Sequence, residues 1–159
     1  MVVLDIQIRP AAPRDVNRLS EIAYSAKAHW GYPAAWLAQW ASALTITADL
    51  ILRQPTFVAA AGETLIGFHA LEDLGDRWSL AHLWVVPERH GAGVGRRLLA
   101  HAIETVRTLR PGVIEIESDP HAAPFYERCG ARRVGVVPAP MPGAPSRALP
   151  LLELHALAG

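Results

Sequence analysis

The chain has 159 residues, of which 51% are hydrophobic and 19% charged, and its 15 Lys and Arg side chains balance 15 Asp and Glu. This length is typical of one domain that buries roughly two-thirds of the surface of its unfolded chain. A net charge of zero gives no general attraction to nucleic acid or to a membrane surface, so we expect neither as a partner. The single cysteine, Cys129, excludes an intrachain disulfide and a cysteine-based zinc site.

The beginning of the sequence gives no sign of a targeting segment. It lacks the basic stretch followed by an apolar stretch that a signal peptide needs. No apolar window reaches the roughly 20 residues that a membrane-spanning helix requires. We therefore expect a cytoplasmic protein.

The first half of the chain predicts helices followed by paired strands. Apolar and polar residues alternate up to Pro10, which indicates a first strand. The turn at residues 61–64 between two apolar stretches predicts a hairpin. The expected elements are a strand at 3–10, a helix at 14–30, a second helix from Pro33, and strands at 56–60, 65–72 and 78–86.

The second half predicts alternating helices and strands. The expected elements are an amphipathic helix at 93–110, a strand at 113–118, a short helix at 122–129, and strands at 132–137 and 149–157. Residues 138–150 contain five of the 13 prolines, which predicts a loop. The order of elements indicates a mixed α/β fold whose sheet is antiparallel in its first half.

Between the strand at 78–86 and the helix at 93–110 lies the sequence His-Gly-Ala-Gly-Val-Gly, residues 90–95. Arg96 stands where a dinucleotide fingerprint has its third glycine, and Arg96 and Arg97 follow Gly95 where a P-loop has its lysine and its Ser or Thr. The sequence therefore matches neither motif. Backbone amides in such a turn can converge on an anion, and the positive end of the helix dipole reinforces them. The alternative is a tight connection with no ligand, for which one glycine would suffice. We therefore interpret the turn as a phosphate-binding site.

Two segments resemble the GNAT superfamily of N-acetyltransferases. Residues 90–95 are similar to its acyl-CoA signature [QR]-x-x-G-x-[GA], with His90 in place of Gln or Arg. Residues 119–130 are similar to its N-x-x-A-x-x-F-Y-x-x-x-G segment, with Asp119 in place of Asn. The order of elements also fits the family across residues 3 to 155. The resemblance implies a GNAT fold, with the central strands splayed around acetyl-CoA, and a single transferase domain over residues 1–159.

The resemblance also implies where acetyl-CoA binds. The strand around residues 83–86 would pair with the pantetheine arm, and the amides of residues 91–96 would hold the pyrophosphate. The implied cofactor-binding residues are Leu83, Trp84, Val85, Val86, His90, Gly91, Ala92, Gly93, Val94, Gly95, Arg96, Asp119, Phe125 and Tyr126.

Acetyl transfer to an amine needs a base for the amine and an acid for the leaving thiolate. Tyr126 is the expected acid, because a phenol stays protonated near neutral pH; the alternative is a packed tyrosine. His82 is the expected base, since it shares a strand face with Trp84 and titrates near neutrality. A core histidine is equally compatible with the pattern, and Glu117, with Glu115, is the second choice. The backbone amide of Val85 is expected to hold the oxyanion.

The acceptor side is marked only by aromatic residues. His29, Trp30 and Tyr32 are expected to bind the acceptor, in a segment that also contains Trp36 and Trp40. These rings would suit an apolar or cationic amine, although tryptophans that pin helices to the sheet are the alternative. No histidine pair has a metal-binding spacing, so no metal is expected.

The sequence therefore predicts an acetyl-CoA-dependent N-acetyltransferase. The acetyl group would pass directly to a primary amine of a small molecule or a protein in a ternary complex. Cys129 is poorly placed as a nucleophile, so no acyl-enzyme is expected. An acyl-CoA-binding sensor or interaction domain of the same fold is the alternative. The sequence does not give the oligomeric state, and the resemblance allows a homodimer because family members often dimerise.

Overall fold

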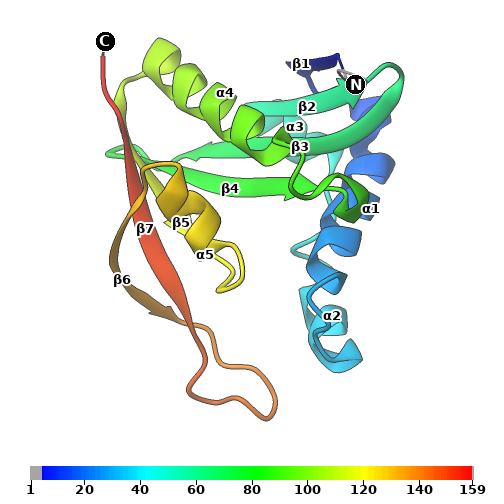
Figure 1. Cartoon of the computed structure of the whole chain (residues 1–159), viewed down its shortest axis with the longest axis vertical. Helices are drawn as coiled ribbons and strands as arrows, with labels where there is room; N and C mark the ends of the chain where they lie inside the picture. The colour runs from blue at the N-terminus through cyan, green and yellow to red at the C-terminus, as the bar shows by residue number, and fades with distance from the viewer. Residues whose placement is uncertain (1–4, 159) are drawn as a thin grey trace. The chain divides into compact units, whose positions relative to one another are not determined.

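The computed structural model describes residues 5–158 and has the mixed α/β fold that was expected (Figure 1). Its strands follow the order β1-β2-β3-β4-β5-β7-β6 in one sheet. The strands are β1 (Ile6–Pro10), β2 (Thr56–Ala61), β3 (Thr64–Asp73), β4 (Trp78–Val85), β5 (Gly112–Glu117), β6 (Arg132–Pro138) and β7 (Ala148–Ala156). The helices are α1 (Val16–Ala28), α2 (Ala34–Trp40), α3 (Ala48–Arg53), α4 (Val94–Leu109) and α5 (Ala123–Arg128), with 3-10 turns η1 (Pro13–Asp15) and η2 (Pro87–Arg89).

The chain divides into two compact units. The first holds the described residues up to Leu71 together with His82–Ala102, and the second holds Glu72–Ala81 and the described residues from Ile103 onward. No helix among the described residues is long and apolar enough to cross a membrane.

In the first unit β1, β2 and β3 pair antiparallel, which confirms the expected arrangement of this half. α1 turns Leu19 and Ile22 toward the sheet, where they are fully buried with Phe68 of β3. The spacing of the apolar residues along α1 predicts this face, since positions three and four apart lie on one side of a helix. The start of α4 adds Leu98 to the same core.

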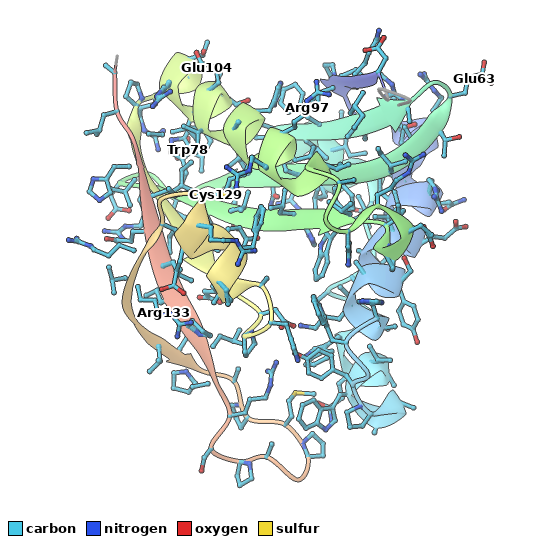
Figure 2. The ribbon with its side chains drawn as sticks, in the orientation of Figure 1. Glu63, Trp78, Arg97, Glu104, Cys129 and Arg133 are labelled. Carbon is cyan, nitrogen blue, oxygen red and sulfur yellow. The ribbon has the colours of Figure 1, made fainter. Side chains whose placement is uncertain are left out.

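In the second unit β5 runs parallel to β4 at Trp78 and Ser79, and antiparallel to β7 along its length. The carboxyl end of α4 is fixed by Arg110. Its guanidinium makes two bonds of 2.7 and 2.8 Å to Asp73 and lies 4.8 Å from the ring of Trp78, which is labelled in Figure 2. The Trp78 indole in turn donates to the carbonyl of Arg110 at 3.1 Å.

Two expectations about element positions need correction. Helix α3 was not foreseen, because its six residues are too few to show a helical period; Thr47 caps it by accepting from the Leu50 amide at 3.1 Å. The proline-rich stretch is also slightly less irregular than expected, because Pro138 ends β6, whereas Pro150 lies in β7 as the strand expected at 149–157 predicts. Both prolines are tolerated because they lie near strand ends, and β6 is an edge strand. The first residues of the strand expected at 3–10 lie outside the described residues.

The buried His69 pairs with the half-buried His101 within the first unit. Nε2 of His69 is 3.0 Å from Nδ1 of His101, and the ring of Phe57 packs against both. Among the described residues Nδ1 of His69 has no hydrogen-bond partner. Burial lowers the pKa of His69 to about 3, with a smaller effect from His101, so the folded protein holds His69 neutral.

Acidification is expected to destabilise the protein through His69. An unfolded histidine has a pKa of about 6.5, so below that pH the unfolded chain binds a proton that the folded chain does not. The free energy of unfolding should fall as the pH drops from about 6.5 toward 3, by about 2 kcal/mol at pH 5 from this residue. Urea unfolding of wild type and His69→Gln at pH 7.5 and 5.0 measures it. Between pH 7.5 and 5.0 the free energy of unfolding of the variant should fall by about 2 kcal/mol less than that of wild type. An equal fall in both proteins would contradict the assignment of this pH dependence to His69.

Gly67 of β3 allows a close approach to β4. A Cβ at this position would lie 2.8 Å from the carbonyl oxygen of Trp84 and 3.0 Å from Leu98 Cδ1. Gly67→Ala should therefore destabilise the fold by about 1–3 kcal/mol, because backbone must shift to make room. Gly135→Ala is the control, since a Cβ there meets nothing within 4 Å. Equal urea midpoints for the two variants would show that the approach of Gly67 to Trp84 is not tight.

Candidate functional site

The glycine turn joins β4 to α4 within the first unit, after η2. Gly91 and Gly93 have φ of 80° and 88°, a left-handed backbone that favours glycine. A Cβ at either would meet nothing within 4 Å, and residues 90–93 are exposed. The helix proper begins at Val94, whose buried side chain anchors the turn to the core.

The turn has the donors that an anion needs. The first intrahelical bond runs from the Arg97 amide to the Gly93 carbonyl at 3.1 Å, so the amides of residues 94–96 have no acceptor within the helix. Arg96 and Arg97 are exposed beside them, and Figure 2 labels Arg97 on α4. This set of amides and guanidinium groups fits a pyrophosphate chemically.

His90, which departs from the family signature, makes a hydrogen bond to β4 and ring contacts with the residues after α1. Its Nε2 lies 2.9 Å from the Val85 carbonyl, which can only accept, so the histidine donates. Its ring stacks on Trp30 at 6.1 Å and meets His29 edge-on at 5.1 Å. His90 therefore connects β4, the turn and the end of α1, and two of the expected acceptor residues contact the turn directly.

The end of β4 offers backbone groups on one side only. The Val86 amide donates to the Ile66 carbonyl of β3 at 2.9 Å. Because backbone groups alternate along a strand, those of Leu83 and Val85 point away from β3. The Val85 carbonyl already accepts from His90, so the groups of Leu83 and the Val85 amide are the ones suited to an extended ligand.

The surroundings of His82 place its pKa below the value that its residue type predicts. It lies on one face of β4 with Trp84, as expected, and its Nδ1 accepts from the Trp84 indole at 3.0 Å. The proton of the neutral ring is therefore on Nε2. Burial lowers the pKa of His82 to about 4, because the charged form would lose its hydration. At neutral pH this histidine is uncharged, and the lone pair of Nδ1 is engaged.

In the second unit α5 carries Tyr126, which is buried, with its ring 5.1 Å from that of Phe125. Burial raises the pKa of the Tyr126 phenol far above its usual value, and Cys129 and Asp119 contribute in the same direction. The phenol therefore stays protonated over any working pH. Glu117, the second choice for a base, is exposed at the end of β5.

Asp119 has a partner that the sequence analysis missed. Its Oδ1 accepts from both the amide of His121, at 2.8 Å, and the Nδ1 of the same residue, at 2.9 Å. The carboxylate thus closes the turn that leads into α5. The spacing Asp-x-His was the available signal, because a carboxylate two residues before a histidine can bond to its backbone and its ring together.

Two further aromatic residues, Tyr32 and Trp40, lie beside Lys27, a residue to which the sequence assigned no role. Lys27 Nζ lies 5.0 Å from the Tyr32 ring centroid and 4.3 Å from that of Trp40. Tyr32, the third expected acceptor residue, therefore lies with this lysine. No group of three or more metal-binding side chains occurs among the residues that the structure describes.

Comparison with models of protein families identifies one family for part of the chain. Residues 53–130 match the family model of the acetyltransferase (GNAT) domain. No curated protein sequence matches the chain significantly.

Solved structures share the fold at low identity. PaiA N-acetyltransferase from Thermoplasma acidophilum, in complex with coenzyme A, is 20% identical over 95% of this chain and 99% of that one, with a TM-score of 0.79. Ribosomal-protein-S18-alanine N-acetyltransferase from Escherichia coli is 18% identical over 98% and 96%, with a TM-score of 0.72. The protein yncA from Salmonella typhimurium, with its cofactor acetyl-CoA, is 19% identical over 98% and 96%, also with 0.72.

The family match covers the glycine turn and the segment around Tyr126, which are the two segments that carried the resemblance in the sequence. The solved structures share the fold across nearly the whole chain. Residues 53–130 thus match the acetyltransferase (GNAT) domain, and the whole chain shares its fold with solved N-acetyltransferases.

Proposed function

We propose that the chain, acting as one transferase domain, moves an acetyl group from acetyl-CoA to a primary amine of a small molecule or a protein. The observation that carries this proposal is the exposed turn of residues 90–93, with two left-handed glycines, followed by the amides of residues 94–96, which have no acceptor within α4. Two structural neighbours were solved with coenzyme A or acetyl-CoA, which supports the same co-substrate here.

The cofactor would bind along the turn and the end of β4. The amides of residues 91–96 and the side chain of Arg96 would hold the pyrophosphate. Leu83 and the amide of Val85 would pair with the pantetheine arm, because their backbone groups point away from β3. Asp119, Phe125 and Tyr126 of the second unit are proposed to contact the same arm, as the family segment implies.

The chemistry is a direct transfer. The neutral amine attacks the thioester carbonyl, a C–N bond forms, the C–S bond breaks, and the thiolate leaves as coenzyme A after taking a proton. Tyr126 is the proposed donor of that proton, since its phenol remains protonated. The amine loses its own proton to a base.

His82 is the proposed base, directly or through water. The hydrogen bond from Trp84 to its Nδ1 must then be released during the transfer. Glu117 remains the alternative, because its exposed carboxylate needs no such rearrangement.

The first test is calorimetric titration with acetyl-CoA, with NAD and ATP as controls. Gly93→Ala should weaken acetyl-CoA binding at least tenfold, because an L side chain at φ 88° disturbs the amides of the turn. Gly62→Ala is the matched control: it also has a positive φ and open space around the Cβ, but it lies in the β2–β3 hairpin. Equal affinities of the two variants would contradict the site. Binding without turnover on any amine would favour the sensor alternative.

Removal of the proposed acid should separate turnover from binding. Tyr126→Phe deletes only the hydroxyl and should lower kcat about 100-fold or more, with acetyl-CoA affinity changed by less than about threefold. Tyr24→Phe, an exposed tyrosine on α1, is the control and should keep wild-type kcat. Wild-type kcat in Tyr126→Phe would refute the assignment of the acid.

A further inference from the structure

The first unit has a pocket at the beginning of α1, the end of that helix that lies away from the glycine turn. Its volume is about 670 Å³, which is within the range of small-molecule sites. Three arginines line it, Arg9, Arg14 and Arg18, together with Glu63 and Thr64 of the β2–β3 hairpin. These residues all belong to the first unit. We call this site the arginine pocket.

Arg9 and Asp15 form a closed pair on one wall of the arginine pocket. Arg9 donates to both oxygens of the Asp15 carboxylate, at 2.9 and 3.2 Å. The Ala12 amide donates to Oδ2 of the same carboxylate at 2.8 Å. The hydrogen bonds from Arg9 are the main reason why the pKa of Asp15 lies below its usual value. The pair is neutral as a whole, so it supplies a fixed wall and no net charge.

The other two arginines keep donors for a ligand. Arg14 makes no hydrogen bond or ion pair with another described residue and acts on Asp15 only through its charge. Arg18 donates through Nη2 to the Leu65 carbonyl at 3.2 Å and reaches the exposed Glu21 at 3.4 Å, which leaves it further N–H donors. Arg14 lies in η1 and Arg18 on the first turn of α1, so local sequence brings both to one pocket.

The charges around the arginine pocket favour an anion. The start of a helix carries partial positive charge, so arginines placed there are unfavourable and an anion is favourable. Asp15, the carboxylate at this helix start, is already bonded to Arg9 and to the Ala12 amide. The lining has three arginines and two carboxylates, those of Asp15 and Glu63, so positive charge is in excess. A bound anion would compensate Arg14 and Arg18.

We propose that the arginine pocket binds the phosphate group of a small phosphate monoester that also carries hydroxyl groups. Phosphate suits two guanidinium groups better than a carboxylate does, because its terminal oxygens are enough for two arginine forks. The hydroxyl groups would bond to Glu63, which Figure 2 labels at the β2–β3 hairpin, and to Thr64. Among the described residues Glu63 makes no other hydrogen bond or ion pair.

The arginine pocket and the proposed pyrophosphate turn are separate sites of the first unit. α1 has 13 residues, so about 20 Å of helix lie between the arginines at its start and His29, which contacts the turn through His90. A phosphate ester in the pocket would leave the turn open to acetyl-CoA. This proposal therefore does not depend on the proposed function.

Calorimetry without acetyl-CoA tests the arginine pocket, with glycerol 3-phosphate, inorganic phosphate, glycerate and glycerol as probes. Wild type should bind glycerol 3-phosphate more tightly than phosphate or glycerate, and should not bind glycerol. Arg14→Gln should weaken the binding of glycerol 3-phosphate about tenfold or more, because it removes a guanidinium that no other described residue engages. Arg132→Gln is the matched control: it removes an exposed arginine of β6, in the second unit, and should bind as wild type does.

Glu63→Gln tests the sign of the electrostatics. It should strengthen the binding of inorganic phosphate about twofold, because a negative charge leaves the lining while the phosphate has no hydroxyl group to lose a partner. Weaker binding of phosphate by this variant would contradict the placement of the anion.

Equal affinities of Arg14→Gln and Arg132→Gln for glycerol 3-phosphate would overturn the proposal, as would binding of glycerate or phosphate as tightly as the ester. Displacement of glycerol 3-phosphate by saturating acetyl-CoA would place it at the glycine turn and would also overturn the proposal. Failure of acetyl-CoA itself to bind would instead reject the proposed function, and the comparison of Arg14→Gln with Arg132→Gln would still decide whether the arginine pocket binds the ester.

Discussion

The left-handed backbone at Gly91 and Gly93 is the constraint on which the rest of the first unit depends. It lets the chain reverse from β4 into α4 within a few residues, so the amides of the helix start are exposed while Val94 and Leu98 enter the core. The same turn places His90 where it can bond to Val85 and stack on Trp30. One backbone conformation thus positions a proposed anion site, the end of β4 and the end of α1 together.

Burial has a second general effect, on the protons that the chain holds. His69 and His82 are kept neutral by the loss of hydration that a charged ring would suffer, and Tyr126 is kept protonated for the same reason. Neutral groups in these places avoid uncompensated buried charge. For Tyr126 this protonated state suits an acid. For His82, burial lowers the pKa and so makes the neutral ring a weaker base. Burial therefore favours Tyr126 as the acid and disfavours His82 as the base, a difference that residue type alone does not predict.

Much of this could be predicted from the sequence, because local patterns have local causes. The glycine spacing and the helical period after it are set within about 20 residues of chain, and the turn and α4 follow from them. The packing of Leu19 and Ile22 follows from spacing in the same way. Helix α3 was not predicted because six residues are too few to show a helical period, and Pro138 was assigned to the loop because a composition count ignores position within a strand. The pKa of His82 depends on burial in the folded chain, and the contact of Lys27 with Trp40 depends on how α2 packs beside α1, so no local pattern reveals either.

The proposed pyrophosphate site holds charge through the backbone of the turn. The amides have fixed positions, so a site made from them is rigid and suits a pyrophosphate, which is the same in every catalytic cycle.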